Sequence, residues 1–283
     1  WPASDAEKEA LEGMLFDPTG ERFTVTNTYS TNQYGEVGLA LGDTPLIQPT
    51  EVADAQDLAA IAAVEADNAA RAITLDDGSG TDYTRSQFLT PPYVSNTDPV
   101  RVGAAATFTE PVVLTEGGSP SNPTYRFQPT TSVSGPDYTS TSPAVFENTR
   151  TAAPEEVGGD LSVAPFNVLN FFTTLGDADD DNVGDNGCLA YVDRDGDGNN
   201  VRGGCDQRGA WDPADLQRQQ EKIVAAINTL DADVVGLMEI ENSAALGEQP
   251  DEATEALVAA LNAAAGEQKW AANPSSDELP PAS

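Results

Sequence analysis

Two polar side chains, Asn167 and Glu239, belong to two apolar runs with the composition of strands, Asn167 within the first and Glu239 directly after the second. The first run spans 161–172 and the second spans 234–238. If the two strands are neighbours, an amide and a carboxylate meet at one edge of a sheet. Hard divalent cations such as Mg²⁺ or Mn²⁺ take one or two carboxylates together with water and phosphate oxygens. The pair therefore predicts a metal and phosphate site.

The segment between the two runs predicts a helix that positions both ends. Asp212 is a good N-cap, Pro213 suits the first helical position, and the helix is expected to run to Leu230. Its apolar residues form one stripe that packs on a sheet. A strand, a helix and a strand in this order predict a sheet with helices on its faces, so the run 161–172 is expected to be buried on both faces. A further helix is expected over 251–265.

A polar insert at 176–209 contains two groups of aspartates. Asp193, Asp195 and Asp197 match the first positions of a calcium loop, but its twelfth position is Gly204 instead of a bidentate Glu. The sequence leaves a Ca²⁺ site and a solvated acidic loop equally open. The second group, Asp177, Asp179, Asp180 and Asp181, lacks the turn glycine and favours a solvated loop.

The two cysteines, Cys188 and Cys205, lie within the same insert. A bridge across a loop of this length stabilises a fold by about 3 kcal/mol, and such bridges persist in oxidising compartments. We therefore expect a disulfide. Two cysteines without any histidine are too few for a zinc site.

The charge of the chain limits how it can bind polyanions. Its 283 residues include 13 Lys and Arg against 47 Asp and Glu, for a net charge of −34. A basic surface for sequence-independent binding of nucleic acid is thereby excluded, so polyanion binding would need metal ions. The composition also suits brine or seawater, where salt screens self-repulsion. No window is long and apolar enough to predict a membrane span.

The first half of the chain has a different pattern. Short β-like runs alternate with turn residues over 1–130, which predicts a small antiparallel β module with one helical insertion near 55–72. Residues 131–160 are rich in Ser, Thr, Pro and Gly and predict a linker to a second domain at 161–283. The first residue is Trp1, and the start is expected to be an interior point of a longer protein.

The motifs FNVLNFF, QRQQEKIVAAINTL, DADVVGLMEIEN and EALVAALNAAAG follow one another in an order that resembles the endonuclease/exonuclease/phosphatase superfamily. More narrowly, the chain is similar to the secreted bacterial nucleases of the ExeM/NucH type. That resemblance implies an α+β protein, with a small OB-like β-barrel module followed by the first part of a DNase I-like α/β sandwich. It also implies an extracellular bacterial protein, for which the charge suggests a marine or halophilic source.

The resemblance assigns roles to individual residues. It implies that Glu239 binds Mg²⁺ or Mn²⁺ and that Asn167 orients a phosphate oxygen or a metal-bound water. Arg208, in an Arg-Gly-Ala run, would contact a phosphate or form a structural salt bridge. Glu241 and Asn242 are weaker candidates, for positioning the site. The implied activity is metal-dependent hydrolysis of phosphodiesters in extracellular nucleic acid, with DNA preferred and RNA left open.

The chain departs from this family because it contains no histidine. Proton transfer near neutral pH most often uses histidine, so we expect this fragment alone to be inactive. Two alternatives stay open at this point. One is a phosphomonoesterase or phospholipid phosphodiesterase of the same fold, because the metal site does not choose the leaving group. The other is a calcium-binding adhesion or matrix module built on the acidic loop.

Overall fold

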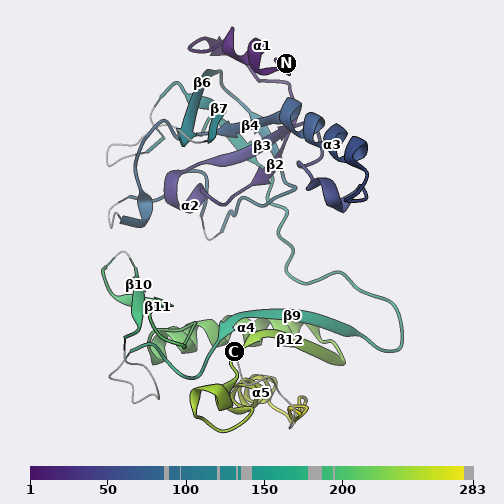
Figure 1. Cartoon of the computed structure of the whole chain (residues 1–283), viewed down its shortest axis with the longest axis vertical. Helices are drawn as coiled ribbons and strands as arrows, with labels where there is room; N and C mark the ends of the chain where they lie inside the picture. The colour runs from purple at the N-terminus through teal and green to yellow at the C-terminus, as the bar shows by residue number, and fades with distance from the viewer. Residues whose placement is uncertain are drawn as a thin grey trace. The chain divides into compact units, whose positions relative to one another are not determined.

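The computed structural model describes residues 1–85, 89–95, 97–119, 122–131, 133–134, 142–177, 187–193 and 195–276. The chain has a mixed α+β fold and forms two compact units, Trp1–Arg150 and Thr151–Ser283 (Figure 1). Across the described ranges, no helix has the length and apolar character needed to cross a membrane.

The first unit contains one mixed sheet with the strand order β1-β6-β7-β4-β3-β2-β5-β8. The strands are β1 (Leu15–Phe16), β2 (Phe23–Asn27), β3 (Val37–Leu41), β4 (Ala72–Leu75), β5 (Ala105–Phe108), β6 (Val112–Ser119), β7 (Asn122–Pro129) and β8 (Ala144–Phe146). Only the β4–β7 pair is parallel, and the other neighbours are antiparallel. The helices are α1 (Asp5–Glu9), α2 (Thr31–Tyr34) and α3 (Leu58–Arg71), with 3-10 turns at Pro49–Glu51 and Tyr83–Arg85.

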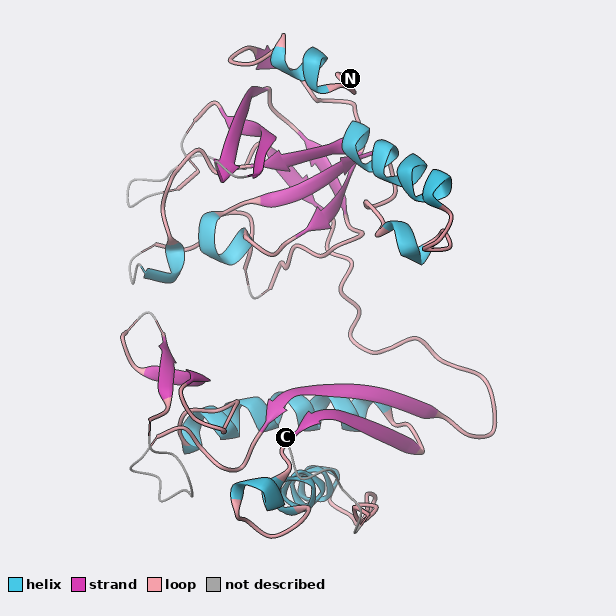
Figure 2. Cartoon of the chain, viewed as in Figure 1, coloured by secondary structure: helices cyan, strands magenta, loops and turns pink. Residues whose placement is uncertain are grey.

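This sheet curls back on itself, as its crossing strands indicate in Figure 2. β5 leads into β6 after three residues, yet the two strands lie at opposite ends of the path β6-β7-β4-β3-β2-β5. Aromatic rings fill the enclosed core, where Phe127 lies edge-on to Phe23 and Phe108. The helix α3 lies within the range of the predicted helical insertion, and Asp57 caps it through Ala60 N.

Part of the predicted linker belongs to the first unit. β8 pairs with β5 in antiparallel register, and Val133 is buried. The run Ala144-Val145-Phe146 is too short to stand out among its Ser, Thr and Pro neighbours, but edge pairing does not need a long strand. The remainder of the predicted linker includes 135–141, which lie outside the described residues.

The second unit is built on two strands and two helices. β9 (Val163–Phe171) pairs in parallel with β12 (Val234–Ile240), and α4 (Pro213–Leu230) connects them. Asp212 caps α4 by accepting a hydrogen bond from Asp215 N. A hairpin of β10 (Leu189–Val192) and β11 (Gly198–Gly203) precedes α4, and a 3-10 turn (Ser243–Leu246) and α5 (Glu252–Ala265) follow β12. Gly266 ends α5 in a left-handed conformation.

The strands of this unit are buried on one face only, whereas the sequence predicted that 161–172 is buried on both. Val168 and Phe171 pack with α4 and α5 in one core, while Val163 and Leu169 are exposed. The continuous apolar run misled the prediction because its length and composition fit either case. The described part of the sheet has two strands, and both helices contribute to the same core.

A buried polar cluster lies in the first unit. Arg126 forms ion pairs with Glu36 and Asp76, and the Tyr83 hydroxyl donates to the Asp77 carboxylate. Tyr83 is fully buried and Asp77 nearly so. Burial, followed by the hydrogen bond to Asp77, raises the pKa of Tyr83 to about 12. The phenol is therefore held in its neutral form by the fold.

Replacing Tyr83 by Phe should change how stability depends on pH. The unfolded phenol titrates near 10.0, so the stability that the neutral phenol provides is complete below that pH and is lost as pH rises toward 12. When the pH rises from about 9 to about 11, the unfolding free energy of the wild type should fall by about 1 kcal/mol more than that of Tyr83→Phe. Urea unfolding measures the difference. Tyr29→Phe, at a 93% exposed position, should behave as the wild type. Equal pH dependence in the wild type and Tyr83→Phe would contradict the assignment.

Candidate metal and phosphate site

The pairing of β9 with β12 breaks at the predicted site. Met238 pairs with Asn167, and the next pair is Ile240 with Phe171. Glu239 therefore stands alone against three residues of β9. Glu239 has a φ of 60°, and Leu169 and Asn170 each have a φ of 52°. Such left-handed conformations cost non-glycine residues roughly 1–3 kcal/mol and concentrate at functional sites.

Side chains around the break hold this conformation. The Asn167 Oδ1 accepts a hydrogen bond from Leu169 N at 2.7 Å. From α4, the Gln219 Nε2 donates to the Leu169 carbonyl at 2.8 Å and also reaches the Val168 carbonyl at 3.3 Å. These contacts satisfy backbone groups that the broken ladder leaves unpaired.

Asn167 and Glu239 are brought together on adjacent strands, and both are exposed. The Glu239 carboxylate accepts no hydrogen bond and forms no ion pair within the part of the chain that the structure describes. The Asn167 Nδ2 likewise donates to none of the described groups, and it faces no competition as a donor to a phosphate oxygen. One open carboxylate beside one amide donor fits Mg²⁺ or Mn²⁺, which retain several waters and share a phosphate. Within the described ranges, no group of three or more His, Cys, Asp or Glu side chains gathers around a metal position.

Glu241 has a structural role. It is 4% exposed, and its carboxylate accepts hydrogen bonds from Thr174 N at 2.8 Å and from Ser243 Oγ at 2.6 Å. It thereby joins the end of β12 to the segment after β9. Asn242, its neighbour, is half-buried. The sequence resemblance ranks both residues below Glu239, as weaker candidates for positioning the site.

Arg208 directly precedes Gly209, which packs against Asn170 at the break in the β9–β12 pairing. A Cβ placed on Gly209 would approach the Asn170 carbonyl oxygen to 2.1 Å, and Gly209 has a φ of +78°. The Arg-Gly-Ala run therefore needs its glycine for close packing against β9. Arg208 itself is exposed and forms no ion pair within the part of the chain that the structure describes. It is free to contact an anion.

The acidic loop is the turn of the β10–β11 hairpin. The Asp193 Oδ1 accepts hydrogen bonds from the backbone N–H groups of Asp195, Gly196 and Asp197 at 2.8, 3.0 and 3.1 Å. One oxygen of the first expected Ca²⁺ ligand is therefore engaged in shaping the turn. Of the second acidic group, Asp179, Asp180 and Asp181 lie outside the described residues, while the backbone N–H of Asp177 donates to the Trp211 carbonyl at 2.8 Å.

A disulfide between Cys188 and Cys205 closes the open end of the same hairpin. Trp211 fixes the hairpin to the start of α4 from the other side. A Cβ on Gly198 would lie 2.6 Å from Trp211 Cδ1, and one on Gly176 would lie 2.7 Å from its Cε3. The indole therefore lies against two glycine backbones, which holds β11 beside β9 and α4.

A cavity of about 370 Å³ lies between β9, β11 and α4, with Asn167 in its wall. The sequence did not predict it. Asn199 and Asn200 line it from β11, and Arg218 and Lys222 line it from successive turns of α4. Lys222 is exposed and pairs with no described residue, whereas Arg218 pairs with Asp215. The helical spacing of the two cations was visible in the sequence, but the strand that faces them was not.

Asp215 is an unusual member of this cavity wall. It is 7% exposed, and its Oδ1 accepts from Arg218, while its buried Oδ2 has no hydrogen-bond partner among the described groups. Burial, and next the charge of Asp212, raise the pKa of Asp215. A buried acceptor without a partner costs about 1–3 kcal/mol, which marks a position where a ligand donor would be welcome.

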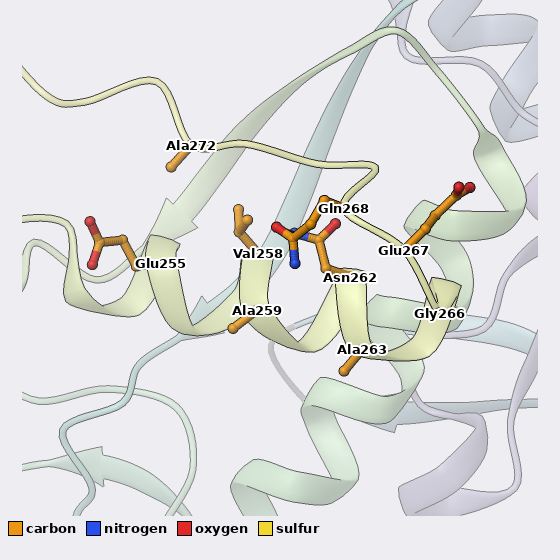
Figure 3. A pocket seen from close by; sticks show the side chains of 9 residues that line it. All are labelled: Glu255, Val258, Ala259, Asn262, Ala263, Gly266, Glu267, Gln268 and Ala272. Atoms are coloured by element: carbon orange, nitrogen blue, oxygen red, sulfur yellow. The ribbon is translucent and has the colours of Figure 1, made fainter.

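A larger cavity of about 800 Å³ runs along α5 (Figure 3). One of its polar side chains, Asn262, is already engaged: it accepts hydrogen bonds from Lys269 N and Trp270 N and donates to the Trp270 carbonyl. Ala259, Ala263 and Gly266 provide much of the remaining wall. Asn262 therefore fastens the segment after α5.

Gly209→Ala should destabilise the packing at the break in the β9–β12 pairing. The new Cβ would overlap the Asn170 carbonyl oxygen, and alanine disfavours the positive φ. We expect a loss of at least ~2 kcal/mol in the unfolding free energy of the second unit. Gly236→Ala is the matched control, because its nearest contact is the Ala164 carbonyl oxygen at 4.0 Å. Urea unfolding followed by Trp fluorescence measures both, and equal stabilities would refute the packing role of Gly209.

Comparisons with protein-family models, with curated proteins and with solved structures find no match for this chain.

Proposed function

We propose that this chain is part of a secreted, metal-dependent nuclease that hydrolyses phosphodiester bonds, most favourably in DNA. The observation that carries the proposal is Glu239. Its carboxylate is open, its backbone is held in a left-handed conformation, and it stands one residue from the pairing partner of Asn167. Non-glycine residues in left-handed conformations cluster at active sites and ligand clamps.

Two features of the surroundings support phosphate as the substrate group. Asn167 offers a free amide donor, and Arg208, Arg218 and Lys222 supply exposed cationic groups in the same unit. When bound at Glu239, Mg²⁺ or Mn²⁺ would neutralise charge on a phosphate. The role of the chain's own residues is to hold the phosphate and orient it. Because the chain has no histidine, we propose that proton transfer requires groups outside it and that the chain alone is inactive.

We also propose a fold for each of the two units. The first unit is an OB-like barrel, supported by the path β6-β7-β4-β3-β2-β5 with β5 leading into β6. The second unit is the first part of a DNase I-like sandwich, supported by the parallel β9–β12 pair with its α4 crossover. An extracellular location is supported by the Cys188–Cys205 disulfide.

The metal assignment is testable on this chain by NMR. Substoichiometric Mn²⁺ should broaden the side-chain amide resonances of Asn167 and the backbone resonance of Leu169. Glu239→Gln should abolish this local broadening, because it removes the open carboxylate. Glu255→Gln, at an exposed position of α5, removes the same charge elsewhere and should leave it intact. Broadening that persists in Glu239→Gln would place the metal at another group.

The nuclease assignment is testable in a longer protein that carries this chain. Its Mg²⁺-dependent cleavage of plasmid DNA should fall about 100-fold or more in Glu239→Gln, with little change in Glu255→Gln. The chain alone should cleave nothing. A panel of plasmid DNA, RNA, a phosphomonoester and a phospholipid separates the nuclease from the phosphatase and lipase alternatives of the same fold. Full DNA cleavage by Glu239→Gln would refute the assignment.

A further inference from the structure

The cavity between β9, β11 and α4 combines three chemical properties. Arg218 and Lys222 are one helical turn apart and present positive charge at its α4 wall. Asn167 and Asn200 add amide groups from two strands. Phe166, Val168 and Ile223 add apolar surface. A cavity of about 370 Å³ lined by cationic, amide and apolar groups suits a small ligand with one anionic end and one apolar end that forms hydrogen bonds.

The cationic wall is free to bind an anion. Arg218 is 55% exposed at its side chain, and its pair with Asp215 occupies only part of a guanidinium that has five donors. Lys222 has no partner in the described part of the chain. In a protein with a net charge of −34, two such cations beside one cavity are a local exception. A phosphate group can contact both.

Asp215 sets the requirement for the other end of the ligand. Its buried Oδ2 accepts no hydrogen bond within the described structure, and the residue lines the cavity. A carboxylate oxygen accepts from an amino group and repels a carbonyl oxygen. The occupant should therefore present a hydrogen-bond donor at this position, and the exocyclic amino group of a base is one that free phosphate and ribose 5-phosphate both lack.

We propose that this cavity is a subsite for one nucleotide of the substrate, in which Arg218 and Lys222 bind the phosphate and Asp215 accepts a hydrogen bond from an amino-bearing base. The subsite deepens the proposed nuclease function and rests on it for the identity of the substrate. It lies beside Asn167. The metal ligand Glu239 is not among its lining residues.

The test is isothermal titration of the full chain with CMP, UMP and ribose 5-phosphate in EDTA. CMP carries the amino group, UMP carries a carbonyl in its place, and ribose 5-phosphate lacks the base. CMP should bind about tenfold tighter than either of the other two. Asp215→Asn should remove the preference for CMP over UMP, because an amide can donate to the uracil carbonyl.

Variants separate the two ends of the ligand. Lys222→Gln should weaken the binding of all three compounds about equally, whereas Lys269→Gln, which removes a cation paired with Asp231, should change nothing. Glu239→Gln should also bind CMP normally, so failure of the metal site and failure of the subsite give different results. Circular dichroism checks the fold of each variant.

If Asp215→Asn does not fold, a measurement on the wild type tests the subsite. Intermolecular NOEs should connect the cytosine H5 and H6 protons of bound CMP to the methyl groups of Ile223 and Val168, which line the cavity. Equal affinity for CMP, UMP and ribose 5-phosphate would overturn the base contact. Absence of saturable CMP binding, or NOEs only to other methyl groups, would overturn the subsite.

Discussion

The second unit depends on one break in a parallel strand pair. Beyond Met238 and Asn167 the β9–β12 ladder loses its register, and three non-glycine residues adopt left-handed backbones. A regular ladder would have turned successive side chains to opposite faces of the sheet. The break instead leaves Glu239 open beside Asn167, while Glu241 is buried as a brace. Gln219 and Gly209 make this arrangement possible, because one satisfies the freed carbonyls and the other allows close approach.

The elements that carry the site follow from local rules and could be predicted. Asp212 and Pro213 begin α4, Gly266 ends α5, and both helices lie where the apolar periodicity placed them. The pair of strands with a crossover helix also followed from composition, and the structure adds that the strands are parallel. These features depend on residues close together in the sequence, and such interactions are readable from one chain.

The features that could not be predicted depend on contacts between distant segments. The unpaired Oδ2 of Asp215 is evident only once α4 lies against β9 and β11. Gly209 looks like any turn glycine until the Asn170 carbonyl is placed against it. The exposed face of β9 was missed because an apolar strand reads the same whether one or both of its faces are covered. Sequence spacing specifies elements, while packing decides which polar atoms remain without partners.

The net negative charge of the chain is compatible with its candidate phosphate-binding side chains, because the repulsion and the contacts act over different distances. Four of the 13 Lys and Arg residues lie between Arg202 and Lys222. Repulsion from the remaining surface reaches a polyanion over a Debye length, about 8 Å at 0.15 M salt and about 3 Å at 1 M. The proposed contacts of Arg218 and Lys222 with a phosphate would act at hydrogen-bonding distance, which is shorter than the Debye length at 0.15 M salt. Moderate salt therefore shortens the reach of the repulsion from the acidic surface, which reconciles a net charge of −34 with the proposed phosphate subsite.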